Sequence, residues 1–323
     1  MDLDIKLSSN KDFFAHTPMH LAYEMSFENK VDALIYEIIS EVIPTIDSTE
    51  TAIFTITPDS GDPIEFDGIL YKVEHLGSQN NLKQMRLYFY SKYSLKMEST
   101  EPLYGKGNVT SIAQSFYSKA GFNNFDVRDS DIALDTLLLP STATIEEGIE
   151  YCLSRAVAGN GYMRGAVVGN RVIIRSILNG SEDLKELPLA VNSIDDNRKR
   201  IDLDGGLNVR MVSDADNVAD LTNTFEGNSS VSKNVFYSTS SSVLNNALIK
   251  ATQSRIYYSN FTANVSITSW YPMLGSNIIV DENSMVAENS GLLTGKYYAL
   301  SQTLLFTFGT AAAWSTCKII KVG

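Results

Sequence analysis

The chain has 323 residues, of which 44% are hydrophobic and 20% are charged, and its formal net charge is -12. This composition is typical of a folded globular protein and excludes wholesale disorder. The acidic balance argues against specific nucleic-acid binding, because a nucleic-acid-binding face is basic. No apolar run reaches the ~18–20 residues of a membrane-spanning helix, and the N-terminus lacks the apolar core of a secretory signal. We expect roughly two or three domains, folded in a cytoplasm.

The first predicted elements are a strand and an amphipathic helix. Segment 19–29 alternates apolar and polar residues, which predicts a half-buried strand with four residues on one side: Leu21, Tyr23, Met25 and Phe27. Segment 31–46 has apolar residues at helical spacing and is interrupted by Pro44, which predicts a helix. We expect this helix to pack on the sheet of its own domain, with binding to a partner or a membrane as the alternative.

Strands are expected to resume after this helix. Three segments rich in β-branched and aromatic residues predict them: 51–59, 63–77 and 82–95. The pair Asp67–Gly68, between strand-like flanks, predicts a two-residue hairpin turn. Together these elements predict a first β-rich domain over residues 1–102.

The pattern becomes helical in the region 103–190, for which we expect a small α/β domain. A helix is predicted from Val109 to the glycine at position 121, which favours a helix end. A second helix is predicted from Thr144, whose spacing to Glu147 is that of a capping box. Two short strands joined at Gly169–Asn170 follow it.

Residues 191–323 are expected to form a second β-rich domain. A polar linker leads into it, a strand is predicted at 207–212, and the Ser/Asn-rich stretch 213–242 is predicted to be a long exposed loop or excursion. A helix over 243–256 should turn these residues inward: Leu244, Ala247, Leu248 and Ala251. The stretch 261–281 reads as a strand, a break at Pro-Met-Leu-Gly and a second strand, and the tail after Gly295 adds at least two more strands.

The histidines do not predict a metal site. His16 and His20 have the spacing of two zinc ligands on a helix, but Pro18 lies between them and no glutamate follows the first histidine. His75 stands alone near the end of a predicted strand. We expect no metal ligands.

The remaining motif candidates also have ordinary structural explanations. The strings YGKGN (104–108) and GNGYMRG (159–165) do not match a phosphate-binding loop. Neighbouring carboxylates at 146–147 and 195–196 do not face each other as a glycosidase pair would. Cys152 and Cys317 are best explained as buried, reduced thiols. We therefore predict no catalytic or cofactor-binding residues, no cofactor, and a protein that is not an enzyme.

The order of the elements carries a resemblance to a known family. A strand RLYFYSKYS (86–94) leads to a helix ending in Ala-Gly, and then to a helix-plus-hairpin unit. Later come an Ala-rich helix, a strand, the break PMLGSNIIVD (272–281) and a strand beginning GKYYALSQTLLF (295–306). Over about residues 60–315, this order resembles the baseplate hub proteins of contractile-tailed bacteriophages and the hub half of type VI secretion spike proteins.

The resemblance implies a mostly β, α+β fold with two tail-tube-like β-barrel domains, each with a bracing helix, separated by the small α/β domain. It implies a homotrimer whose six barrels form a pseudo-sixfold ring. Such a ring would join the hexameric tail tube to the trimeric central spike in the virion, after assembly in the host cytoplasm. Its partners would be the spike, the tail tube or tube-initiator protein, and the tape measure protein as a further candidate, without membrane insertion.

Other functions remain open at this point. One is a different tail-tip component, such as a distal tail or tail-associated protein. A β-rich adhesin would place aromatic residues around a glycan-binding groove, and a cell-wall hydrolase would require a cleft with facing carboxylates. Under the hub interpretation, the acidic charge suits a channel through which DNA slides.

Overall fold

The computed structural model describes most of the N-terminal half and selected parts of the remainder. The described residues are 2–7, 16–27, 31–44, 51–58, 62–159, 161–177, 187–189, 191–196, 208–212, 218–221, 232–236, 247–248, 251–252, 262–267, 274–275, 277–280 and 295–321. The predicted features that lie largely outside them are the polar linker before residue 207 and the helix at 243–256, including its inward residue Leu244.

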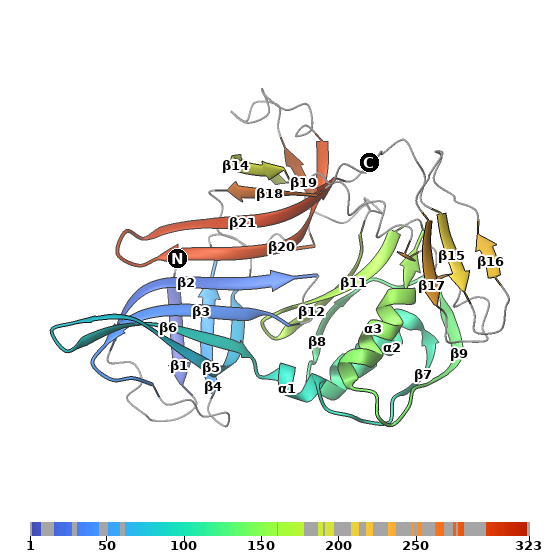
Figure 1. Ribbon diagram of the computed structural model, residues 1–323, viewed down its shortest axis with the longest axis horizontal. Coiled ribbons are helices and arrows are strands. Elements are labelled where there is room, and N and C mark those ends of the chain that lie inside the picture. Colours follow the sequence, from blue (N-terminus) through green and yellow to red (C-terminus); the bar gives the residue numbers. More distant parts are fainter. Residues whose placement is uncertain are drawn as a thin grey trace.

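The first half of the fold is a curled, six-stranded antiparallel sheet (Figure 1). Its strands, in spatial order, are β1 (Asp2–Leu7), β4 (Thr51–Thr57), β5 (Ile64–Gln79), β6 (Leu82–Ser91), β3 (Ala33–Ser40) and β2 (His16–Ser26). The alternation predicted for β2 is confirmed, since Leu21, Tyr23, Met25 and the following Phe27 are all buried. Alternating residues of the other strands fill the concave side, as period-two patterns require.

The helix expected at 31–46 is wrong, because most of this segment is the strand β3. Its apolar residues fit both periods, and Leu34, Tyr36 and Ile38 are the buried set of a strand. The strand pairs with β2 on one side and β6 on the other. Sheet hydrogen bonds on both edges and three β-branched isoleucines favour the strand over the helix. The segment therefore does not provide the bracing helix that was expected for the first half-barrel.

The hairpin turn expected at Asp67–Gly68 is also wrong. Both residues lie inside β5, and the chain turns instead at Asn80–Asn81, between β5 and β6. The two asparagines have φ of 54° and 65°, the left-handed conformation that a tight two-residue turn needs and that asparagine tolerates. After β6, the expected strand to residue 95 gives way to a short helix, α1 (Tyr93–Met97).

The α/β unit has the predicted elements. Helix α2 (Val109–Ala120) ends at Gly121, and α3 (Ile145–Arg155) begins with a complete capping box between Thr144 and Glu147. The helices cover one face of a sheet in the order β10 (Val157–Ala158), β11 (Gly161–Val168), β12 (Arg171–Ile177) and β8 (Asn124–Val127) (Figure 1). A two-stranded sheet, β7 (Tyr104–Asn108) with β9 (Ala133–Leu138), completes the unit.

The second half-barrel continues the first sheet. Strand β20 (Gly295–Thr307) pairs with β2 in an antiparallel register from His20–Thr307 to Ser26–Ser301. Beyond it follow β21 (Ala312–Lys321), β18 (Thr262–Ile267) and β14 (Val191–Asp196), while β19 (Asn277–Val280) joins β20 to β13 (Leu187–Leu189). The fold is therefore α+β and mostly β, as expected, with two curled half-barrels in one twelve-stranded sheet.

The strand–break–strand pattern at 261–281 is confirmed as β18 and β19, with a turn at Leu274–Gly275 between them. Gly275 has a φ of 80°, which side-chain-bearing residues rarely adopt. The two strands do not pair with each other: β18 pairs with β14 and β21, and β19 with β13 and β20. The break therefore moves the chain between two places in the sheet wall.

Parts of the stretch 213–242 are strands, where a long loop or excursion was predicted. The stretch contains β16 (Val218–Leu221) and β17 (Ser232–Phe236), which pair on either side of the predicted strand β15 (Asn208–Val212). These three strands form a separate small sheet (Figure 1). In the helix that follows, Ala247, Leu248 and Ala251 are buried, as predicted.

Candidate functional site

The sequence candidates for chemistry lie apart from one another. His16 and His20 lie on β2, where their side chains contact the Tyr36 hydroxyl at 2.8 Å and the Thr307 hydroxyl at 3.0 Å, respectively. Burial raises the pKa of the Cys152 and Cys317 thiols to about 12, so neither is a thiolate nucleophile at neutral pH. Within the described parts of the chain, no three His, Cys, Asp or Glu side chains gather as a metal site would require.

The remaining motifs have structural roles. Glu147 accepts a hydrogen bond from the Thr144 amide at 2.8 Å and completes the helix cap, while Glu146 lies in the same first turn. The string YGKGN is strand β7, which runs directly into α2, and its last residue, Asn108, caps that helix by accepting a hydrogen bond from the Thr110 amide. The string GNGYMRG leads into β11.

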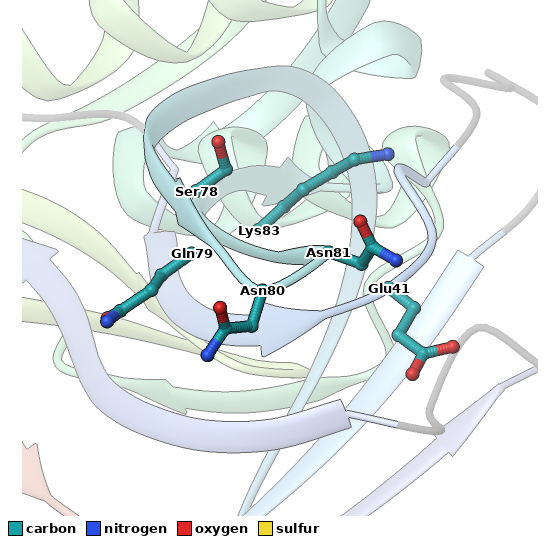
Figure 2. Close-up of a pocket in the computed structure, with 6 residues that line it drawn as sticks. All are labelled: Glu41, Ser78, Gln79, Asn80, Asn81 and Lys83. Atoms are coloured by element: carbon teal, nitrogen blue, oxygen red, sulfur yellow. The ribbon is translucent and has the colours of Figure 1, made fainter.

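The tip of the β5–β6 hairpin projects from the first half-barrel (Figure 1). A cavity of about 490 Å³ lies at this tip and is lined by six polar residues: Glu41, Ser78, Gln79, Asn80, Asn81 and Lys83. Figure 2 shows their side chains spread around the turn, with Glu41 on the same side as Asn81. Small-molecule pockets are mostly apolar, so this open polar cavity fits the rim of a protein contact better than a substrate site.

Apolar side chains surround the same tip. Val42 and Ile43, which follow β3, are 68% and 51% exposed, and Leu76 and Leu82 on the hairpin are 40% and 43% exposed. The register Ser40–Lys83 brings the end of β3 to the hairpin turn. Exposed apolar residues gathered next to polar ones are typical of protein–protein interfaces, and we define the hairpin-tip surface as these four residues and the cavity lining.

The convex face of the hairpin carries aromatic rings and ion pairs. Tyr71 lies 5.1 Å from Tyr90 and 6.2 Å from Tyr88, measured between ring centroids. The Tyr88 hydroxyl donates a hydrogen bond to Glu74 at 2.5 Å, and this bond is the main cause of the lowered pKa of Glu74. Arg86 bridges Glu74 and Glu37 on the neighbouring strand. These contacts link the basal part of the hairpin across β5 and β6 and join it to β3.

A buried polar cluster joins the first half-barrel to the α/β unit. The Tyr23 hydroxyl donates a hydrogen bond to Asp32 Oδ2. The Gly169 amide lies 2.7 Å from the Tyr23 hydroxyl oxygen and 2.7 Å from Asp32 Oδ2. Burial raises the pKa of Asp32 to about 7, although both hydrogen bonds act in the opposite direction. Its other oxygen, Oδ1, has no hydrogen-bond partner among the residues that the structure describes. The cluster therefore fixes the β11–β12 turn against the first sheet.

Sequence reasoning missed the hairpin-tip surface and this cluster. Two adjacent asparagines between strand-like segments are a turn signal that could have located the tip. The contact between Asp32 and Gly169 joins residues far apart in sequence and had no local signal.

Comparison with known proteins places the fold. No protein-family model matches the chain, and no curated protein matches it by sequence. A tail protein from Neisseria meningitidis MC58 has the same fold, with a TM-score of 0.68, 11% identity, and coverage of 99% of this chain and 97% of that chain. The 43 kDa tail protein of prophage MuSo2 from Shewanella oneidensis matches with a TM-score of 0.67, 10% identity, and coverage of 99% and 98%.

A third similar structure comes from a secretion system. The E. coli c3393 protein, described as a type VI secretion component similar to T4 tail proteins gp27 and gp5, matches with a TM-score of 0.58 and 12% identity, over 99% of this chain and 77% of that chain. The chain thus has the fold of phage tail proteins and related secretion spike proteins, and the resemblance seen in its sequence is confirmed at the level of fold.

Proposed function

We propose that the chain is a structural component of a phage-like tail, and specifically the baseplate hub. The observation that carries this proposal is the pair of curled half-barrels joined through β2 and β20 in one chain. The likeness to tail proteins extends over 99% of the chain, so it includes both half-barrels and the α/β unit.

The proposed role follows from symmetry. Three copies of a chain with two half-barrels present six similar units in a ring. Such a ring meets a sixfold tail tube on one side and a threefold spike on the other, through head-to-tail contacts between copies. Its partners are the spike, the tube or tube-initiator protein and the tape measure protein, and its location is the virion tail.

The role requires shape and not catalysis. On the first half-barrel, Arg86 and Lys72 are paired with the carboxylates of Glu37 and Glu74. Among the residues that the structure describes, no helix is long and apolar enough to span a membrane. We propose a protein without enzymatic activity, which a turbidity assay on peptidoglycan tests: clearing of the suspension would contradict it.

Native mass spectrometry of the purified chain tests the hub proposal. We expect a species of three times the 35.6 kDa chain mass, alone or with a spike partner. Electron microscopy of that species should show a ring with six similar lobes. A chain that remains monomeric at high concentration and with the spike present would overturn the hub role.

The two alternatives make different predictions. A distal tail or tail-associated protein would assemble with the tube but not form a trimer with the spike. An adhesin requires aromatic residues around a groove, whereas the cavity at the hairpin tip has an entirely polar lining. No observation on the described residues favours the adhesin.

A further inference from the structure

The β5 strand has one edge that is only partly paired. Strand β4 pairs with β5 from Ile64 to Ile69, whereas β6 pairs with it from Gly68 to Gln79. In the described part of the chain, no strand lies along the other edge of residues 71–79. A row of peptide N–H and C=O groups about 30 Å long is therefore open to another strand.

The shape of this edge restricts what can bind to it. The register between β5 and β6 shifts at two places, between Leu70 and Lys72 and between His75 and Gly77. The extra residues, Tyr71 and Leu76, are both large and exposed. Bulges twist an edge and limit the strands that can add to it, so the edge suits one matched strand better than any extended chain.

We propose that residues 71–79 of β5 pair with β14 of a neighbouring copy, so that the sheet continues from one chain to the next. This proposal rests on the ring proposed above and names one of its contacts. It is a case of strand addition, in which backbone hydrogen bonds supply affinity and side chains supply selectivity.

The chain itself provides the complementary strand. The twelve-stranded sheet ends at β14, whose only partner within the described residues is β18. A closed ring of identical copies requires contact between two different surfaces, and the edges of β5 and β14 are two such surfaces. The six residues of β14 fit within the nine-residue edge.

Charge favours the same pairing. The β5 edge carries Lys72 and His75. Lys72 lies 4.0 Å from Glu74 and over the Tyr88 ring, and Glu74 is also bound by Tyr88 and Arg86. Strand β14 ends in Asp195 and Asp196. An acidic strand would thus meet an edge whose own carboxylate is occupied.

Hydrogen exchange on the full chain provides the first test. Amides along a strand point alternately to its two edges, and those directed toward β6 are already bonded. We expect the remaining amides of residues 71–79 to exchange roughly tenfold or more slowly in the trimer than in dilute monomer, because they gain partners on assembly. The amides of residues 83–90 in β6 serve as the control, since β3 and β5 already flank this strand within one chain. A trimer that leaves the exchange of residues 71–79 unchanged would overturn the strand pairing.

Cross-linking between differently labelled chains identifies the partner strand. One sample carries Ser78→Cys and the other Asn192→Cys, and a short bis-maleimide links them only across molecules. The native thiols Cys152 and Cys317 are 1% and 2% exposed, so they should not compete. A chain with Asp4→Cys in β1, the opposite end of the sheet, is the matched control.

The outcomes separate the two proposals. A trimer that links Ser78→Cys to Asn192→Cys, and not to Asp4→Cys, supports the pairing. A trimer that links Ser78→Cys to Asp4→Cys or to a second Ser78→Cys overturns the pairing but leaves the hub role intact. A chain that never forms a trimer overturns both.

Discussion

At the residue scale, Gly169 combines a left-handed backbone with a close approach to another strand. It has a φ of 61° in the β11–β12 turn, and its amide binds the Tyr23–Asp32 pair. A Cβ atom there would lie 2.5 Å from the backbone oxygen of Glu65. Both the backbone conformation and the close approach to β5 therefore require glycine.

We expect Gly169→Ala to lower the free energy of unfolding by about 2 kcal/mol or more, because the strain of positive φ adds to the overlap with an immobile carbonyl. Urea denaturation measures this change. Gly77→Ala in β5 is the control, since nothing lies within 4 Å of a Cβ atom at that position. Equal effects at the two sites would contradict the close contact between the turn and β5.

Asp32 should make stability depend on pH. Its folded pKa is about 7, above the ordinary value of 3.8, so between these values the folded chain holds a proton that the unfolded chain releases. The contribution of this group to the free energy of unfolding is full below pH 4, declines as pH rises to about 7, and is constant above it. The total decline is roughly 4 kcal/mol at 1.36 kcal/mol per pKa unit.

Denaturation of the wild-type chain and Asp32→Asn between pH 4.5 and about 8 tests this dependence. We expect the Asp32→Asn variant not to show the Asp32-dependent decline in the free energy of unfolding over this interval. Asp62→Asn, at an exposed position, should keep it. Parallel pH profiles for wild type and Asp32→Asn would show that Asp32 ionises similarly in the folded and unfolded chains.

At the element scale, the helix that contains Leu248 is the one brace whose buried residues agree with the sequence pattern. Leu248 is 9% exposed, whereas Thr252, four residues later, is half-buried. We expect Leu248→Asp to cost about 3 kcal/mol or more, because it buries an unpaired charge. Soluble yield and melting temperature measure the effect, with Thr252→Asp as the milder control; similar melting temperatures would show that this helix does not brace the sheet.

Elements set by local chemistry were predictable. The capping box of α3 and the glycine end of α2 follow from residues within one helical turn, and both are present. The break at Gly275 likewise depends on its own backbone. For such elements the sequence pattern has one physical solution.

Elements decided by distant contacts were not predictable. The residues of β3 satisfy a helical and a strand period, and only its neighbours β2 and β6 select the strand. Gly68 resembles a turn residue, but a Cβ atom there would lie 2.4 Å from the Phe66 ring, so glycine is needed for packing inside β5. The hairpin-tip surface forms only because segment 33–40 is a strand and because β5 continues past Gly68 to the turn at Asn80–Asn81. Neither result follows from the local sequence, so the surface could not be predicted.

At the scale of the whole molecule, the net charge of -12 bears on the proposed ring. We expect the wall of its central channel to be acidic, because a surface of the same sign as DNA lets the polymer slide without binding. Electron microscopy of the trimer would show which side chains line the channel. A channel lined with lysine and arginine would contradict this prediction.

The pairing of β2 with β20 also governs how the protein is made. The partners His20 and Thr307 are separated by nearly the entire chain, and at about 5–20 residues per second the ribosome needs roughly 15–60 s to synthesise the segment between them. Until then the edge of β2 has no native partner, and contacts of such high sequence separation form late. The nascent chain therefore passes through a long interval in which an open strand edge invites aggregation, so chaperones that hold nascent chains should matter more for this protein than for one whose domains close independently.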